Sequence, residues 1–537
     1  IYLKGGYVMP KNNEVKFGDY FNLPNPGLKS YFGIVERGQP DEYRTPFARK
    51  ETPVQEVLKE WEPFVNSLHD KWPSLVEFEN DLKAKVGPMS IMKPLKDRMT
   101  DIDHYYDDVL LSSTPVSDKA VKAVLSEFKG VKGLCPRSQQ KTVDLMKKST
   151  NSGAPYFTKR RDVVAKTLPT ECYTIGDSVM ASVNHKEWKM AAVLGWRGQE
   201  GGPNPEDVKQ RVVWMFPFSV NIAELQVYQP LIECCQKFNL VPAWVSMESV
   251  DQRITRMFDT KGDDDVVICT DFSKFDQHFN SDMQDAAKVI LNSLLNGSSE
   301  ARAWIENVFP IKYAIPLAYD YNKIRFGKHG MGSGSGGTNA DETLVHRALQ
   351  YEAAINCGKR LNPYSQCLGD DGVLTFPGIT VDNVMETYTA HGQEMNESKQ
   401  YVSKHDCVYL RRWHHAQYRQ NGICVGVYST YRALGRLMEQ ERYYDPDVWS
   451  SKMVALRQLS IIENVKYHPL RDQFAEFCMK RDKYRLGIDI PGFLDNIDKI
   501  AQESIELMPD FLGYTKSMTK DQTGLSSWWI VNYLKSK

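Results

Sequence analysis

The chain has 537 residues, of which 42% are hydrophobic and 25% charged. This composition excludes global disorder, and the length predicts three or four lobes at roughly 150 residues per domain. The formal net charge of −1 excludes a uniformly basic nucleic-acid coat but leaves room for a local basic groove. No run of 18 apolar residues occurs, so no membrane span is expected. The ten cysteines form no Cys-x-x-Cys, which favours free thiols over a zinc site or disulfides.

The first part of the chain predicts little regular structure apart from one helical stretch. Residues 1–50 are aromatic and rich in turn residues, and we expect an extended segment that packs on another part of the protein. Residues 54–85 have apolar residues at helical spacing, which predicts helices. Residues 86–218 are expected to mix short helices and loops.

The middle of the chain gives clearer local patterns. We expect a helix over 220–238 and another over 281–295. Between them, Asp265–Thr270 is rich in β-branched residues and predicts a buried strand. A glycine-rich loop, Gly330–Gly337, leads into a predicted helix over 339–355, whose acidic first turn suits the helix dipole.

Next, two short apolar runs flank Gly369-Asp370-Asp371-Gly372, which predicts a hairpin with an acidic tip. Residues beyond about 416 are expected to be mostly helical and to form a separate lobe.

Three signals follow one another within about 100 residues. They are Asp271-Phe-Ser-Lys-Phe-Asp276 after the buried strand, Ser333-Gly-Ser-Gly-Gly-Thr338, and Gly369-Asp370-Asp371. Alone, they could be a helix cap, a linker and an ordinary hairpin turn. Together they supply carboxylates from separate rigid elements, as two-metal phosphoryl transfer requires.

This ordered set resembles motifs A, B and C of viral RNA-dependent RNA polymerases. The details, with the chain length, are most similar to picobirnavirus polymerases, which serve a small double-stranded RNA virus, and next to partitivirus-like enzymes. The resemblance implies an α+β fold, a closed right hand with an antiparallel palm sheet backed by helices.

The same resemblance implies a division into domains. An N-terminal segment, 1–75, would bridge fingers and thumb. The fingers would comprise 76–218 and 281–325, and the palm 219–280 and 326–415. The thumb with its C-terminal tail would comprise 416–537.

By resemblance, Asp271, Asp370 and Asp371 bind two Mg²⁺ ions, with Mn²⁺ as an alternative. Hard oxygen ligands of this kind suit Mg²⁺. Asp276 resembles the second motif-A aspartate, which accepts a hydrogen bond from the ribose 2′-hydroxyl and so favours ribonucleotides.

Motif B departs from the family pattern at one position. Ser333, Gly334 and Thr338 match it and would position the nucleotide, but Glu342 stands where the family often has Asn. Since Glu342 would repel Asp276, either the two acids share a proton or a donor, or Asn339 takes over the sugar contact.

Further basic and polar residues are expected around RNA and the triphosphate. Lys209 and Arg211 resemble motif F and would neutralise the incoming nucleotide. Lys399, with Lys404 as its rival, resembles the motif-D general acid. The expected RNA contacts are Ser152 and Gly153 of a motif-G-like loop, Lys159 and Arg160, and Arg411 and Arg412 of motif E. Residues 399–442 hold eight Lys/Arg against three Asp/Glu, a local basic patch.

The C-terminal tail is unusually aromatic. Trp528, Trp529 and Tyr533 could pack as ordinary core, or they could stack on the first base and support initiation without a primer.

The resulting hypothesis is a viral RNA-dependent RNA polymerase that elongates RNA on an RNA template from NTPs. The alternatives are a reverse transcriptase or other template-directed polymerase, and a non-catalytic RNA-binding viral protein. The resemblance implies RNA template and product duplex, NTPs and viral capsid protein as partners, no membrane association, and a location in the virion interior and host cytoplasm.

Overall fold

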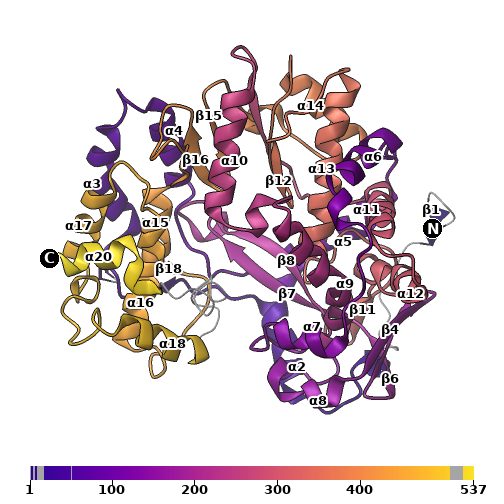
Figure 1. Cartoon of the computed structure of the whole chain (residues 1–537). Helices are drawn as coiled ribbons and strands as arrows, with labels where there is room; N and C mark the ends of the chain where they lie inside the picture. The colour runs from indigo at the N-terminus through magenta and orange to yellow at the C-terminus, as the bar shows by residue number, and fades with distance from the viewer. Residues whose placement is uncertain (1, 4–6, 9–16, 50, 508–523) are drawn as a thin grey trace.

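The computed structural model of the protein describes residues 2–3, 7–8, 17–49, 51–507 and 524–537. Parts of the predicted N-terminal segment and of the predicted thumb therefore lie outside the described residues. Helices and sheets are mixed along the whole chain, and the two termini lie on opposite sides of the molecule (Figure 1). None of the described helices combines the length and the apolar character needed to cross a membrane.

The N-terminal segment is more regular than expected. Strands β1 (Tyr2–Leu3) and β2 (Tyr7–Val8) pair with each other, and helices α1 (Phe17–Tyr20) and α2 (Pro26–Arg37) follow. The expectation of an extended segment over 1–50 is wrong for α2, which starts with a proline and buries one apolar face against β10 (Leu317–Asp320).

After α2, the chain reaches the C-terminal lobe. Strand β3 (Tyr43–Arg44) pairs with β18 (Glu439–Gln440). The predicted helices over 54–85 are confirmed as α3 (Val54–Asn66) and α4 (Pro73–Lys83), with Pro73 opening the second. Both pack on α15 (Thr430–Met438).

A four-stranded antiparallel sheet carries both predicted acidic elements, the strand before Asp271 and the hairpin with Asp370 and Asp371. Its order is β12-β13-β9-β14, with strands β12 (Gln366–Leu368), β13 (Asp371–Leu374), β9 (Val267–Thr270) and β14 (Tyr401–Ser403). The predicted buried strand and the acidic hairpin are both confirmed. Gly372 pairs with Thr270, so Asp271 and Asp371 come at the same end of the sheet.

Helices cover both faces of this sheet. Val267 and Cys269 of β9 pack with α10 (Met247–Thr260) and β15 (Asp406–Tyr409), whereas Ile268 packs with α13 (Thr338–Asn356). Figure 1 shows α10 and α13 on either side of β12. Behind α13 lie α6 (Asp118–Glu127), α11 (Ser281–Leu294) and α14 (Val381–Ala390). The predicted helices at 281–295 and 339–355 are thus confirmed.

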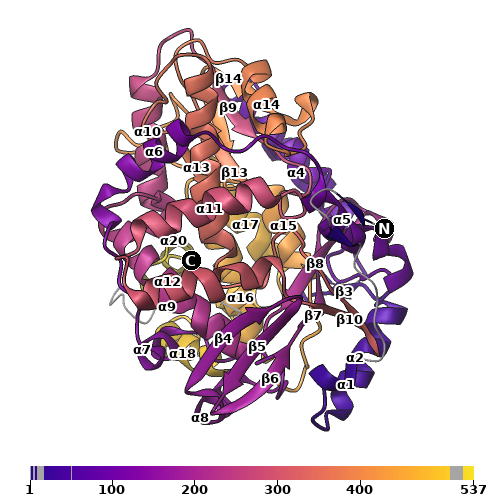
Figure 2. The ribbon, with the colours of Figure 1, turned by 90° about the vertical axis from the view of Figure 1, so that its right-hand side faces the viewer.

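The segment before the central sheet contains strands that the sequence reading missed. Residues 86–218 were expected to hold only helices and loops, but five strands lie there. They are β4 (Thr170–Ile175), β5 (Ser178–Val183), β6 (Lys186–Met190), β7 (Ala192–Gln199) and β8 (Lys209–Met215). Strands β4 to β6 form one antiparallel sheet, and β7 and β8 join β10 and β11 (Lys323–Arg325) in another (Figure 2).

Helices surround these strands. They are α5 (Met99–Asp107), α7 (Gln139–Leu145), α8 (Val164–Thr167), α9 (Phe218–Lys237) and α12 (Ser299–Asn307). Helix α9 agrees with the predicted helix over 220–238. Its almost entirely buried first half connects the strands to the glycine-rich loop.

The C-terminal lobe is mostly helical, as predicted, and has its own apolar core. It is preceded by β16 (Arg412–His415) and β17 (Val427–Tyr428), and it contains α15, α16 (Ser451–Glu463), α17 (Arg471–Arg481), α18 (Ile497–Leu507) and α20 (Trp529–Lys535).

Candidate active site

A cleft of about 1830 Å³ lies between the sheets and the C-terminal lobe. Small-molecule sites usually measure roughly 300–1,000 Å³, so this cleft suits a polymer. Basic side chains outnumber acidic ones on its walls, which favours a phosphate backbone. The basic residues are Lys147, Lys159, Arg197, Lys209, Arg211, Lys274, Arg411, Arg436, Arg442 and Arg457; the acidic ones are Asp101, Asp276, Glu342, Asp370, Asp371 and Glu441.

The predicted metal-binding acids gather at one end of the central sheet. Asp271 directly follows β9 and is exposed, while Asp370 forms the turn between β12 and β13 and reaches the cleft. Gln400 clamps the Asp271 backbone, accepting its N–H and donating to its carbonyl, both at 2.8 Å. Asp371 accepts a hydrogen bond from the Leu410 N–H at 2.8 Å.

These acids lack counter-charges in direct contact. Within the described residues, no Lys, Arg or His forms an ion pair with Asp271, Asp370 or Asp371. Burial, then the charge of Asp370, raises the pKa of Asp371 to about 7. Burial, then repulsion from Asp276, raises the pKa of Asp370. An all-oxygen, mutually repelling set of this kind fits a hard divalent cation, which would relieve the repulsion.

The acids do not form a preassembled cage. In the part of the chain that the structure describes, no three His, Cys, Asp or Glu side chains converge closely enough to hold a metal ion by themselves. Mg²⁺ sites of phosphoryl-transfer enzymes usually take one or two carboxylates and complete the shell with water and substrate phosphates. The geometry therefore fits a site that is completed by the nucleotide.

The predicted conflict between Asp276 and Glu342 is present in the cleft wall. The two carboxyl groups are hydrogen-bonded to each other, and burial followed by repulsion from Asp276 raises the pKa of Glu342 well above its usual range. Glu342 is only 5% exposed, and its raised pKa favours the protonated acid as the donor to Asp276. Asn339 instead accepts a hydrogen bond from the Trp244 indole at 2.8 Å. The geometry therefore favours a shared proton over a sugar contact made by Asn339.

The glycine-rich loop packs closely against the backbone of β8. A side chain at Gly334 would place its Cβ 1.6 Å from the Trp214 carbonyl oxygen, so only glycine fits. The hydroxyls of Ser333 and Thr338 donate to backbone carbonyls of Val212 and Gly332 rather than into the cleft, although both residues line it.

Glu224 of α9 holds the same loop. It accepts hydrogen bonds from the Gly336 N–H at 3.1 Å and from the Ser335 hydroxyl. The amide of Asn221, one turn earlier on α9, donates to the Gly334 carbonyl at 3.3 Å.

The predicted motif-F cations line the same cleft as Asp276, Asp370 and Asp371. Lys209 and Arg211 are exposed on β8 and line the cleft. Partial desolvation by the surrounding protein, then repulsion from neighbouring basic groups, lowers the pKa of Lys209 although its side chain reaches solvent. A phosphate would relieve that repulsion, as the triphosphate assignment requires.

Some predicted RNA contacts lie in the cleft and others do not. Lys159 and Arg411 line it. The prediction for Arg412 is wrong: its guanidinium is buried and paired with Asp251 at 2.8 Å, because Arg412 begins β16 while Arg411 lies in the turn before it.

Three further predicted RNA contacts, in and near the motif-G-like loop, do not reach the cleft either. Ser152 and Gly153 are buried inside their loop, and it is Ser149 and Thr150 that reach the cleft. Arg160 donates to Asn221 at 2.8 Å and is not among the residues that line the cleft.

The C-terminal tail packs on its own lobe. Trp528, Trp529 and Tyr533 are half-buried against the core of the C-terminal helices, and none of them lines the cleft. In this structure the tail packs as the core alternative expects, and the initiation role stays a prediction. Among the described residues of this lobe, the aromatic side chains that line the cleft are those of Tyr443 and Tyr444.

The motif-D candidates stay predictions. Lys399 ends a short 3₁₀ turn and is exposed, and it is not among the residues that line the cleft. Lys404 lies 3.7 Å from Asp264.

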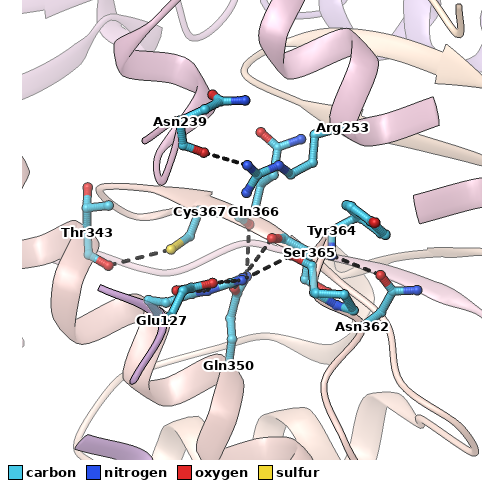
Figure 3. Close-up of polar contacts among 12 residues, drawn as sticks. Glu127, Asn239, Arg253, Thr343, Gln350, Asn362, Tyr364, Ser365, Gln366 and Cys367 are labelled. Carbon is cyan, nitrogen blue, oxygen red and sulfur yellow. Dashed lines mark hydrogen bonds and ion pairs between the residues drawn. The ribbon is translucent and has the colours of Figure 1, made fainter. Parts of the chain in front are cut away.

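Sequence reasoning missed the polar side chains of α13 that face the acidic hairpin. Arg347 pairs with Glu127 of α6 and donates to the Ser365 carbonyl at 2.7 Å, while Gln350 donates to the Gln366 carbonyl at 2.8 Å (Figure 3). The spacing was visible in the sequence, because Thr343, His346, Arg347 and Gln350 fall at i, i+3, i+4 and i+7 and so lie on one face of the helix.

The comparisons with known proteins bear directly on this site. The family model described as viral RNA-dependent RNA polymerase matches residues 88–420, which include Asp271, Asp276, Glu342, Asp370 and Asp371. The chain belongs to the viral RNA-dependent RNA polymerases.

Relatives of this polymerase come from picobirnaviruses. A potential RNA-dependent RNA polymerase of human picobirnavirus (strain Human/Thailand/Hy005102) is 63% identical over 525 residues, covering 96% of this chain and 98% of the relative. The crystal structure of a human picobirnavirus RNA-dependent RNA polymerase matches with a TM-score of 0.92 and 63% identity, covering 97% of this chain and 98% of that one. Its insertion-loop deletion mutant matches with a TM-score of 0.91, 61% identity and the same coverage.

These findings confirm the resemblance drawn from the sequence. The fold is that of a viral RNA polymerase of mixed helices and sheets, and the activity is RNA-directed RNA synthesis. The polymerase therefore acts on RNA and NTPs.

Proposed function

We propose that this polymerase extends RNA by two-metal nucleotidyl transfer, with Asp271, Asp370 and Asp371 as the metal-binding acids. The observation that carries the proposal is that two distant segments bring unpaired carboxylates to one end of the sheet, beside a basic cleft. Bound Mg²⁺ or Mn²⁺ would lower the pKa of the primer 3′-hydroxyl and neutralise the triphosphate.

The chain's own residues orient the nucleotide. Lys209 and Arg211 bind the triphosphate in the same cleft. Asp276, which accepts a hydrogen bond from Glu342, presents its remaining oxygen lone pairs to the ribose 2′-hydroxyl. Lys399 protonates the leaving pyrophosphate, which requires its segment to approach the cleft when substrate is bound.

The domain roles follow from these assignments. The central sheet with its helices acts as the palm, residues 76–218 and 281–325 as fingers, and residues 416–537 as the thumb of a closed right hand. Contacts of the N-terminal segment with β10 and β18 support its bridging role. Template and product duplex occupy the cleft, initiation proceeds without a primer, and the polymerase acts with capsid protein in the virion interior and in the host cytoplasm.

The test is incorporation of labelled ribonucleotides on a defined single-stranded RNA template with Mg²⁺ or Mn²⁺, with and without a primer. Template-length product that disappears in Asp370→Asn supports the metal assignment, because the amide keeps the shape of the carboxylate but not its charge. Asp382→Asn, an exposed acid at the start of α14, is the matched control and should synthesise normally.

Three outcomes would correct parts of this proposal. Full synthesis by Asp370→Asn would contradict the metal site. Product only in the primed lane would contradict primer-independent initiation. Incorporation of deoxyribonucleotides as readily as ribonucleotides would contradict the sugar-recognition role of Asp276.

A further inference from the structure

Helix α13 binds the acidic hairpin through a buried polar stripe, Thr343, His346, Arg347 and Gln350. All four side chains contact backbone atoms of the hairpin or of the residues just before it. A helix face buried against a sheet is normally apolar, because a buried polar group costs free energy unless it is hydrogen-bonded. Four polar residues in one row therefore call for a specific explanation.

Two members of the stripe fix the turn itself. The Gly369 N–H donates to the Thr343 hydroxyl oxygen at 2.9 Å, and His346 Nδ1 lies 2.8 Å from the Gly369 carbonyl oxygen. Since a carbonyl only accepts, Nδ1 carries the hydrogen and donates. Burial lowers the pKa of His346 to about 4, so the ring is neutral and Nε2 is unprotonated. Gly369 is thus held on both of its peptide groups.

The other two members fix the hairpin strands. Arg347 donates to the carbonyls of Ser365 at 2.7 Å and Pro363 at 3.3 Å. Gln350 donates to the carbonyls of Gln366 at 2.8 Å and Val373 at 3.4 Å, so it contacts both strands.

Glu127 completes the network. It binds Arg347 at 2.5 to 3.2 Å and compensates the buried guanidinium charge (Figure 3). The strand contacts hold the hairpin as a body, whereas the turn contacts hold the one residue that precedes Asp370.

The geometry points to Thr343 and His346 as positioning residues that set the direction of the Asp370 carboxylate, and hence the affinity of the proposed metal site. Gly369 has φ +58°, and Asp370 follows it directly. With both Gly369 peptide groups held, rotation about its backbone bonds is restricted, and the Asp370 side chain remains directed into the cleft. The inference rests on the metal assignment under Proposed function.

The same helix also carries the nucleotide-recognition residues. Thr338 begins α13, and Glu342 immediately precedes Thr343. A rigid helix with a rise of 1.5 Å per residue therefore fixes the sugar-recognition acid and the metal-binding turn relative to each other. Loss of the turn contacts should weaken metal binding without removing the acids.

The experiment measures metal affinity directly. The full chain is bound to a primed RNA that ends in a 3′-deoxynucleotide, together with the matching NTP, and Mn²⁺ binding is followed by electron paramagnetic resonance. In parallel, the Mg²⁺ concentration for half-maximal synthesis is measured with a normal primer. Groups that orient metal ligands typically contribute 10–100-fold to metal affinity, so His346→Leu and Thr343→Val should each weaken Mn²⁺ binding about tenfold or more.

Conservative variants separate positioning from a merely structural role. His346→Asn places an amide nitrogen where Nδ1 lies, and Thr343→Ser keeps the acceptor oxygen, so both should restore most of the affinity. The matched control is His414→Leu. His414 is also a buried neutral histidine, with Nδ1 donating to the Cys424 carbonyl at 2.9 Å, but it lies on β16 outside the hairpin. Its replacement should leave Mn²⁺ affinity unchanged.

The outcomes are distinguishable. If Asp370→Ala binds Mn²⁺ as tightly as the wild type, the metal assignment itself fails. If Asp370→Ala loses binding while folded His346→Leu and Thr343→Val match His414→Leu, the positioning role is overturned. Thr343→Val changes almost no volume, so it tests the inference even if His346→Leu does not fold.

Discussion

Two neighbouring acids on α13 have opposite environments. Asp341 is fully buried and compensated: Lys312 lies 3.0 Å away, and the hydroxyls of Tyr228 and Tyr313 donate to it at 2.7 and 2.6 Å. Glu342 faces the cleft, has no cation partner within the described residues and shares a proton with Asp276. The compensated acid stabilises the fold, and the uncompensated acids of the cleft are available for substrate and metal.

The largest effect is expected when one of the uncompensated acids of the cleft is replaced. Asp370→Ala should reduce RNA synthesis at least about a thousandfold, since a bound metal stabilises the transition state by several kcal/mol. Thermal unfolding should change little, because removing Asp370 relieves repulsion. Single-turnover incorporation on a primed template measures the rate; a rate within tenfold of wild type would contradict the assignment.

For the buried acid Asp341, we expect that removing its partner Lys312 lowers the stability of the protein. Lys312→Met should lower the free energy of unfolding by about 3–5 kcal/mol, because it leaves the Asp341 charge buried without its partner. Chemical denaturation measures the change. The double variant Lys312→Met/Asp341→Asn should recover much of it, and a single variant as stable as wild type would show that Asp341 is not held by this ion pair.

A third acid, Glu463, lies outside the cleft and is expected to make the stability of the protein depend on pH. Glu463 caps α20 by accepting the N–H groups of Trp529 and Ile530, at 3.1 and 3.3 Å, and burial raises its pKa to about 7. The folded state therefore binds the proton more tightly than the unfolded state, and its contribution to stability falls as pH rises from about 4.5 to 7.

Glu463→Gln removes that titration and keeps an acceptor for the helix. Relative to wild type, the variant should gain at most about 3 kcal/mol of stability between pH 5 and pH 7.5. Melting temperatures at both pH values provide the measurement. Parallel pH profiles would mean that Glu463 is ionised in the folded protein throughout.

The smallest effect is expected on the preference for ribonucleotides, through Asp276 and Glu342. Asp276→Ala should reduce the preference for ATP over dATP about tenfold, the value of one hydrogen bond to a charged group. Glu342→Gln should change it less, since the amide still donates to Asp276. The ratio of kcat/KM values for the two nucleotides reports the change.

The control for the sugar test is another cleft acid. Asp101→Ala removes an acid that lines the cleft but is already paired with Lys274 at 2.9 Å. Its preference for ATP over dATP should match wild type. Equal loss of preference in Asp101→Ala and Asp276→Ala would indicate a general electrostatic effect.

Local patterns were sufficient for the centre of the fold. The β-branched run before Asp271, the Asp-Gly hairpin and the helix after the glycine-rich loop are each encoded by neighbouring residues. The strands β4 to β8 were missed, because their apolar alternation is weak. β7 moreover pairs in parallel with β10, more than 100 residues away.

Some residues of the candidate site could likewise be predicted from the sequence, and others could not. Asp271, Asp370 and Asp276 were predicted from motif spacing, and the family comparisons place them in the matched region. The stripe on α13 was not predicted, because its partners are backbone carbonyls of a hairpin that no sequence pattern pairs with the helix.

The sequence by itself determined the order of the motifs, the residues able to bind metal, and the family. Only the tertiary structure decided which charges are free to act. Arg411 lines the cleft while Arg412 pairs with Asp251, and Glu342 faces the cleft while Asp341 pairs with Lys312. The physical reason is that the state of a charged group depends on burial and on partners within a few ångströms, and those partners come from distant segments of the chain.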